Sequence, residues 1–132
     1  MNTTTRLSVE VPGLHHGGLP IPQASVVGNL LASGGIVALD PEKNEVPTDT
    51  EAQVELAFAN LRRTVDAAGG RVEDVVKCTV FVRDKSIRPI IDKHWVAMFP
   101  DETSRPARHT ISIDLPEPQQ IQLEIMVVLG QG

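Results

Sequence analysis

The chain has 132 residues, a mass of 14.3 kDa and a formal net charge of −5. This length fits one domain over residues 1–132, with the first 18 residues as an N-terminal strand or loop extension. The single cysteine excludes an internal disulfide framework and a cysteine-rich zinc site. No apolar run is long enough to span a membrane and no apolar signal core is present, so we expect a cytoplasmic protein.

The same composition argues against a nucleic-acid partner. A nucleic-acid footprint usually needs a basic face, and this chain is acidic. Aromatic residues make up only 3% of the sequence and there is no tyrosine, which is too little for a base-stacking platform.

The first third of the chain reads as short strands separated by turns. Gly28-Asn29 between two apolar pairs is a hairpin-type turn signal. Pro20 and Pro22 forbid both a helix and a central strand at residues 19–24. Residues 36–39 are typical of a short strand, which Asp40-Pro41 closes.

The segment from about 48 to 68 predicts a long amphipathic helix. Its apolar residues are spaced by three or four positions and form one stripe, at Val54, Ala57, Phe58, Leu61, Val65 and Ala68. Thr48 and Glu51 fit a capping box at its start, and Gly69-Gly70 stops it. The polar positions between them, Gln53 among others, are expected on the solvent-facing arc.

The rest of the chain adds a strand at 75–82, a helix at 87–99 with a proline in its first turn, and strands at 110–115 and 121–129. On the last strand, the apolar residues alternate from Ile121 to Val127 and face one way. This order of elements predicts an α+β fold in which two helices pack on one face of a mixed sheet.

The four histidines do not predict a metal site. His15 and His16 are adjacent, while His94 and His109 belong to different elements, and no metal-ligand spacing occurs. Cys78 lies in the middle of a strand without a local histidine, which favours core packing over a nucleophile.

Ser104-Arg105-Pro106-Ala107-Arg108 is the most informative segment for function. A proline turn delivers Arg108 to the start of a strand, where its guanidinium is fixed in direction and suited to bidentate binding of a carboxylate. The alternative, which spacing alone leaves open, is a surface arginine that pairs with an Asp or Glu of the same chain.

From about Leu19 to Leu129 the chain resembles the Rid family, the reactive-intermediate deaminases that are also called the YjgF family. The resemblance is carried by matched blocks in one order: residues 20–24, 31–36, 39–41, 74–82, the Pro-Ala-Arg signature at 106–108, Leu115-Pro116 and the closing strand.

This resemblance implies a chorismate-mutase-like fold, assembled as a homotrimer with a barrel-like core and with clefts between subunits. It implies hydrolysis of enamines or imines to keto acids and ammonia, without a metal or bound cofactor. Arg108 is similar to the arginine that holds the substrate carboxylate. The other implied substrate-binding positions are Ser33, Gly34, Ile21, Asp92 and Thr110.

The acid–base positions depart from the family pattern. Ile21 stands where the family has a tyrosine, Asp92 stands where it has an asparagine, and Gln122 falls at the position of the glutamate that orients water. Glu124 shares a strand face with Gln122 and is the substitute that the sequence offers. Two interpretations therefore remain: a deaminase whose catalytic residues are Arg108 with Gln122 or Glu124, and a non-catalytic trimer that binds small carboxylates.

Overall fold

The structure is a computed structural model that describes residues 5–130. The strands are β1 (Leu7–Val9), β2 (Ala24–Val27), β3 (Leu30–Ser33), β4 (Ile36–Val37), β5 (Val75–Val82), β6 (Ala107–Ser112) and β7 (Ile121–Val128). The helices are α1 (Thr50–Ala67) and α2 (Arg88–Met98), and single 3₁₀ turns cover Val72–Asp74 and Lys85–Ile87.

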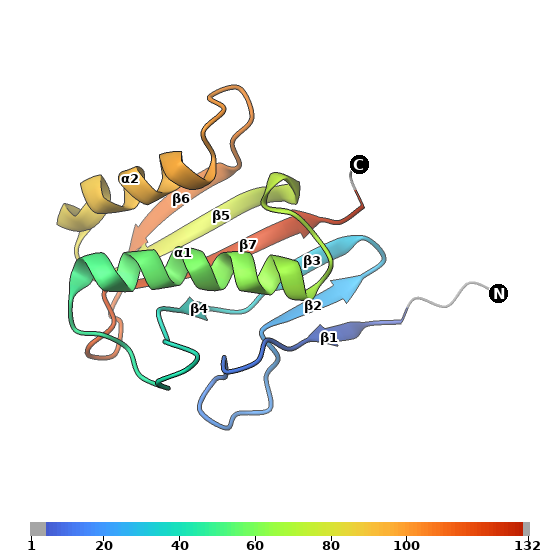
Figure 1. Cartoon of the computed structure of the whole chain (residues 1–132), viewed down its shortest axis with the longest axis horizontal. Coiled ribbons are helices and arrows are strands. Elements are labelled where there is room, and N and C mark those ends of the chain that lie inside the picture. The colour runs from blue at the N-terminus through green and yellow to red at the C-terminus, as the bar shows by residue number, and fades with distance from the viewer. Residues whose placement is uncertain (1–4, 131–132) are drawn as a thin grey trace.

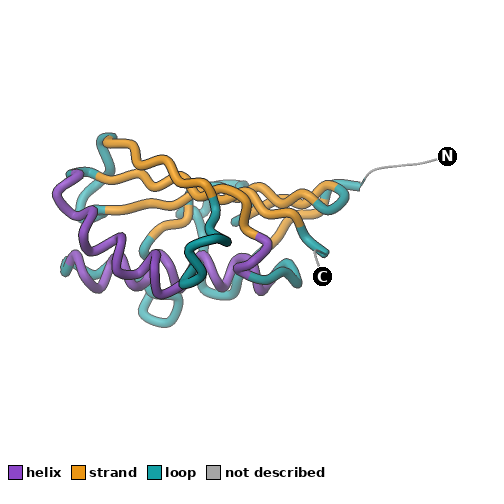
Figure 2. The backbone as a smooth tube through the Cα atoms, turned by 90° about the horizontal axis from the view of Figure 1, so that it is seen from above, coloured by secondary structure: helices purple, strands orange, loops and turns teal. Residues whose placement is uncertain are grey.

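The described strands form one mixed sheet in the order β1-β2-β3-β7-β5-β6, with β4 also paired to β7. β5 and β6 are parallel and every other pairing is antiparallel. Parallel neighbours need a crossover connection, and α2 lies in the segment that connects them. Both helices lie on the same face of the sheet (Figures 1 and 2). The predicted α+β architecture is therefore confirmed.

The core lies between the helices and the covered face of the sheet. Alternate residues of β7 point into it, so that Ile121, Leu123, Ile125 and Val127 are all at most 1% exposed, as the alternation predicted. The stripe predicted on α1 faces them: Val54, Ala57, Phe58, Leu61 and Val65 are buried. Ala68, also predicted in the stripe, is the C-cap residue after the helix and is half-buried against the core. Cys78 is also fully buried, which confirms its predicted place in the core.

The start of α1 differs from the sequence prediction. The helix begins at Thr50, and Asp49 rather than Thr48 is its N-cap, because the Asp49 carboxylate accepts a hydrogen bond from the Ala52 backbone N–H at 2.9 Å. Glu51 does not complete a capping box; its carboxylate pairs with Lys93 and His94 of α2 instead.

Gln53 was predicted on the solvent-facing arc of α1, and this is wrong. Its side chain is fully buried, where its amide donates hydrogen bonds to the Pro47 and Pro118 carbonyl oxygens, both at 2.7 Å. Its amide oxygen accepts a third from the Gln120 backbone N–H, also at 2.7 Å. The burial is possible because these three partners satisfy the amide.

Other boundaries shift by a few residues. The second helix is preceded by a 3₁₀ turn and places Pro89 at its second position, where a proline is tolerated. β6 begins at Ala107 rather than residue 110, since Ala107 pairs with Lys77 of β5. β4 covers only two of the four predicted residues. The hairpin turn at Gly28-Asn29 is confirmed, with Gly28 at φ +61°.

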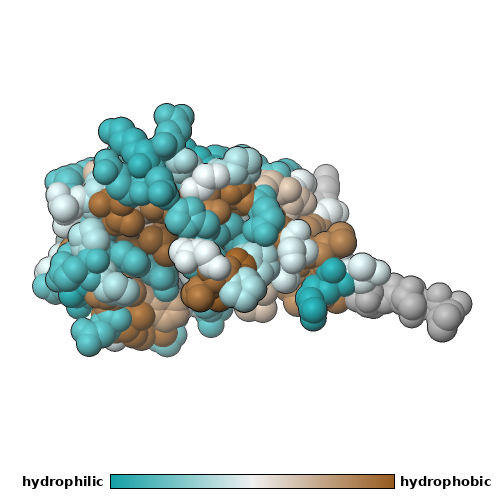
Figure 3. All heavy atoms as spheres, turned by 90° about the horizontal axis from the view of Figure 1, so that it is seen from below, coloured by the Kyte–Doolittle hydropathy of each residue, from teal (hydrophilic) through white to brown (hydrophobic). Residues whose placement is uncertain are grey.

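The sheet face opposite the helices, here called the open face, has no covering layer in residues 5–130 (Figure 2). The strand registers place several apolar side chains on it, namely Val27, Leu30, Phe81, Ile111, Met126 and Val128. Met126 is 45% exposed there. Figure 3, which looks at the molecule from below the view of Figure 1, shows separate hydrophobic areas among hydrophilic ones.

Neither α1 nor α2 is both long and apolar enough to cross a membrane, and they are the α-helices of the described residues.

Candidate functional site

Arg108 is the second residue of β6 and points toward the helix-covered side of the sheet. Its register partner on the neighbouring strand is the buried Cys78, and register partners share a face. Its guanidinium carbon lies 5.1 Å from the centre of the Trp95 ring, within the range of a cation–π contact. The predicted placement of Arg108 at the start of a strand is confirmed.

The helix α2 supplies the other side of this environment. Asp92 and Trp95 are three residues apart and therefore lie on neighbouring parts of one helix face. Asp92 Oδ1 accepts a hydrogen bond from Arg108 Nη2 at 2.7 Å. Trp95 packs edge-on against Phe99, with ring centres 4.8 Å apart, which fixes the ring under the guanidinium.

The Arg108 guanidinium keeps donors for a second anion. It has five N–H groups, and within residues 5–130 Asp92 is the side chain that accepts a hydrogen bond from it. The Arg108 side chain is 21% exposed, so solvent reaches it. The sequence left open whether Arg108 binds a carboxylate ligand or pairs with an acidic residue. The structure contains the pairing, and the guanidinium keeps further N–H donors.

Thr110 lies two residues further along β6 and on the same side as Arg108, since it is in register with the buried Val80. Cys78 is not a nucleophile candidate in this environment. Burial raises the pKa of its thiol to about 12, and the nearby positive charge of Arg108 acts in the opposite direction without overcoming it.

Gln122 and Glu124 lie on the open face, because their alternation on β7 is opposite to that of the buried residues. Glu124 is exposed and in register with Thr79. The Gln122 side chain packs against Gly35: a Cβ at Gly35 would lie 2.7 Å from Gln122 Cδ, so the glycine makes room for the amide. The prediction that Gln122 and Glu124 share a face is confirmed.

Ser33 and Gly34 lie at the end of β3, close to the same part of β7. The Ser33 hydroxyl donates to the Gly34 carbonyl oxygen at 2.8 Å and accepts from the Ile125 backbone N–H at 2.9 Å. The Gly34 N–H donates to the Gln23 carbonyl oxygen, which links this corner to the loop that carries Ile21. Ile21 is 49% exposed.

The predicted site residues thus fall into two groups. The β6 group comprises Arg108, Thr110 and Asp92 of α2. The β7 group comprises Gln122, Glu124, Ser33, Gly34 and Ile21. The strand β5 separates β6 from β7, a distance of about 10 Å at ordinary strand spacing. Arg108 and Gln122 also point to opposite faces, so one chain does not bring the two groups together.

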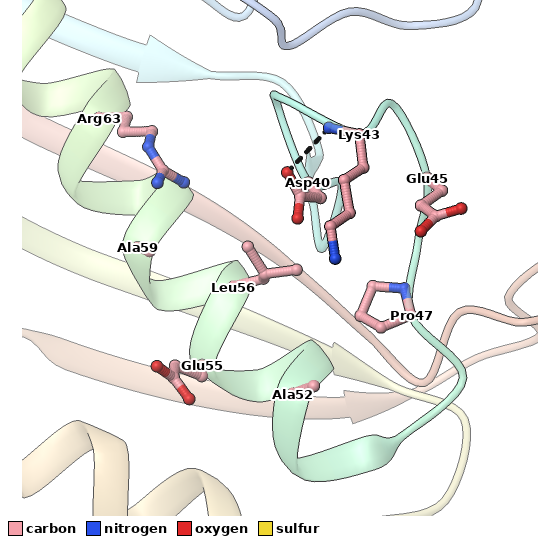
Figure 4. A pocket seen from close by; sticks show the side chains of 9 residues that line it. All are labelled: Asp40, Lys43, Glu45, Pro47, Ala52, Glu55, Leu56, Ala59 and Arg63. Carbon is pink, nitrogen blue, oxygen red and sulfur yellow. Dashed lines mark hydrogen bonds between the residues drawn. The ribbon is translucent and has the colours of Figure 1, made fainter.

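One cavity lies away from both groups of predicted site residues. It has a volume of about 380 Å³ and lies between α1 and the loop at 40–47 (Figure 4). Figure 4 shows Leu56 pointing from α1 toward that loop, with charged side chains such as Lys43 and Arg63 around it. None of the predicted site residues lines it. No group of three or more His, Cys, Asp or Glu suited to a metal ion occurs within residues 5–130.

Sequence reasoning missed the role of Trp95, which it assigned only to the apolar stripe of a helix. It also did not select Asp92 as the residue that pairs with Arg108. The helical spacing of Asp92 and Trp95 is the available signal, but it becomes informative only once α2 is known to lie over β6.

The chain is an α+β protein with two helices on one face of a mixed sheet and an arginine at the start of β6. Comparison with known protein families identifies the class to which this fold belongs. Residues 20–129 match the family described as Endoribonuclease L-PSP. The chain therefore belongs to this family, the Rid (YjgF) proteins.

Two curated relatives carry the same description, 2-iminobutanoate/2-iminopropanoate deaminase. The Escherichia coli (strain K12) protein is 32% identical over 111 residues, which cover 83% of this chain and 87% of the relative. The Dermatophagoides farinae protein is 32% identical over 114 residues, covering 83% and 86%.

Solved structures have the same fold. A Thermotoga maritima protein is similar with a TM-score of 0.86 and 31% identity, covering 96% of this chain and 98% of that chain. The YjgF gene product of E. coli gives a TM-score of 0.83 at 29% identity, covering 92% and 98%.

Proposed function

We propose that this protein hydrolyses a small carboxylated imine, or the enamine that tautomerises to it, to a keto acid and ammonia. The observation that carries the proposal is the supported and partly exposed Arg108, which has unused donors for a carboxylate. The curated relatives described as iminobutanoate and iminopropanoate deaminases support the same reaction class.

Hydrolysis of an imine requires few catalytic groups. Water adds its oxygen to the carbon of the protonated C=N group, the C–N bond then breaks, and its electron pair leaves with nitrogen. The iminium and one water become a keto group and an ammonium ion, so atoms and charge balance. The enzyme has to hold the carboxylate, position the water and move a proton.

We assign the carboxylate to Arg108, with Thr110 beside it. Gln122 and Glu124 are the candidates for positioning water. Gln122 is a neutral amide, which can orient water but accepts a proton poorly, while Glu124 carries a carboxylate that can do both. Ser33, Gly34 and Ile21 complete the β7 group as proposed substrate-binding positions. The reaction as written calls for no metal and no cofactor.

We further propose that the site forms between two copies of the chain in a homotrimer whose open faces build a barrel-like core. Two observations support this assembly. The β6 and β7 groups do not meet within one chain, and the open face carries apolar side chains without a covering layer in residues 5–130. A cytoplasmic location remains a prediction.

The test of this function is ammonia release from freshly generated carboxylated enamines, measured for the wild type and for Arg108→Ala. We expect release by the wild type and a loss of at least about 100-fold in kcat/KM for the variant, because substrate positioning is lost. Arg105→Ala is the matched control, since Arg105 bonds the Phe99 carbonyl oxygen and not the proposed site. Equal rates for wild type and Arg108→Ala would contradict the proposal.

A second candidate function is a non-catalytic trimer that binds small carboxylates. It is favoured by the absence of tyrosine from the sequence and by the neutral Gln122, which the resemblance to the Rid family aligns with the water-orienting glutamate. In that case calorimetry detects binding of 2-oxobutanoate that depends on Arg108, while no carboxylated enamine is hydrolysed faster than in buffer.

We propose no nucleic-acid substrate for this chain, although the family description names an endoribonuclease. The net charge of −5 and the low aromatic content support this part of the proposal.

A further inference from the structure

The Arg108 guanidinium already forms an ion pair with a carboxylate of its own chain. Asp92 Oδ1 lies 2.7 Å from Arg108 Nη2, and the Asp92 side chain is 58% exposed. The remaining N–H groups of the guanidinium and the second Asp92 oxygen have no hydrogen-bond partner among residues 5–130. A ligand can therefore reach a positive and a negative group that lie side by side.

The surroundings leave this pair close to neutral. Trp95 lies against the guanidinium, and Cys78 is a neutral thiol because burial raises its pKa to about 12. The neighbouring cation of α2, Lys93, pairs with Glu51 of α1, and His94 bonds the same carboxylate. Arg88, one helical turn before Asp92 on α2, is exposed and forms no ion pair with Asp92 in the described residues. Arg108 is therefore the cation that Asp92 contacts, and its negative charge acts on a ligand that approaches this pair.

A negatively charged ligand and a zwitterionic ligand interact differently with the Arg108–Asp92 pair. The carboxylate of a simple anion must share Arg108 with Asp92, which is a like-charge contact at short range. A zwitterion places its carboxylate on the unused Arg108 donors and its positive nitrogen beside the free Asp92 oxygen. Each ligand charge then has an opposite partner.

We propose that Asp92 is a specificity-determining residue that makes the Arg108 site select ligands carrying a positively charged nitrogen next to their carboxylate. This inference rests on the proposed function, because it takes Arg108 as the carboxylate anchor. A protonated 2-imino acid has that charge pattern, whereas the keto acid formed from it is a simple anion. Asp92 thus favours the substrate over the product and promotes product release.

The experiment compares two ligands with one carbon skeleton, L-2-aminobutanoate and 2-oxobutanoate, by calorimetry at pH 7. For the wild type we expect tighter binding of the amino acid. Asp92→Asn keeps the side-chain shape and removes the charge, so we expect it to lower the ratio of the two affinities by about tenfold, mainly through tighter binding of the keto acid. Asp66→Asn makes the same charge change at an exposed position of α1 and is expected to leave the ratio unchanged.

The possible outcomes separate this inference from the function on which it rests. If both ligands bind to the wild type and Asp92→Asn leaves their ratio within about twofold, Asp92 does not set specificity and the inference is wrong, while Arg108 remains the anchor. If neither ligand binds, the carboxylate anchor fails and the inference fails with it. Asp92→Ser provides a second charge removal, with the same expected shift, should the asparagine variant not fold.

Discussion

Cys78 lies in the middle of β5 with its side chain fully buried between the sheet and the helices. Removal from water disfavours the thiolate, which raises the pKa of the thiol from its ordinary value of 9.0 to about 12. The pKa of the Cys78 thiol is higher in the folded protein than in the unfolded chain. The contribution of the thiol to stability is therefore complete below about pH 9. That contribution is lost as the pH rises toward 12.

We therefore expect Cys78 to resist alkylation by iodoacetamide at pH 8 in the native protein and to react completely in denaturant. Both the low thiolate fraction and the burial oppose the reaction. Intact-mass measurement of native and unfolded samples checks this directly. Modification of the native protein as fast as that of the unfolded chain would show that the thiol is accessible, contrary to the structure.

At the scale of elements, the start of α1 gives a direct test of the cap that the structure assigns. Asp49→Ala removes the carboxylate that accepts from the Ala52 N–H and should lower the free energy of unfolding by about 1 kcal/mol. Thr48→Ala changes the residue that the sequence pattern favoured as the cap, yet should alter stability by less than about 0.5 kcal/mol. Urea unfolding of both variants measures the difference, and equal losses would contradict the assignment.

The same helix shows what periodicity can predict. Spacing identified the apolar stripe of α1 because burial of that stripe repeats with the turn of the helix. It misplaced Gln53 because a hydropathy pattern assigns every amide to solvent. Two of the three residues that satisfy this amide, Pro118 and Gln120, are 65 and 67 positions away, so their approach could not be read from local sequence.

The candidate site also has features that the sequence predicts and features that depend on tertiary structure. The proline turn predicted that Arg108 enters a strand, and the alternation of β7 predicted that Gln122 and Glu124 share a face. The contacts of Arg108 with Asp92 and Trp95 depend on α2 lying over β6, which is a tertiary arrangement. Residue types and strand positions were therefore predictable, and the charge balance around Arg108 was not.

At the scale of the whole molecule, the two faces of the sheet have different neighbours. One face is covered by α1 and α2 (Figure 1). The strand registers place Arg108 on that face at its β6 edge, and Gln122 and Glu124 on the open face. If turnover needs both Arg108 and a residue of the β7 group, a monomer is inactive. The proposed trimer then assembles each site from two chains.

Mixing two inactive variants tests this arrangement. Arg108→Ala lacks the anchor, and either Gln122→Ala or Glu124→Gln, whichever proves inactive, lacks the water-positioning group. In a trimer refolded from equal amounts of both variants, each interface has one chance in four of combining the two intact groups. The mixture should therefore recover about a quarter of the wild-type rate of ammonia release.

The controls keep this result interpretable. Light scattering should first give the mass of three chains for the wild type and for both variants, and each variant refolded alone should stay inactive. Recovery requires that Arg108 of one chain serve the β7 group of another, since neither variant carries an intact pair. A fully assembled mixture that remains inactive would mean that both groups must come from one chain, which contradicts their positions on opposite faces of the sheet.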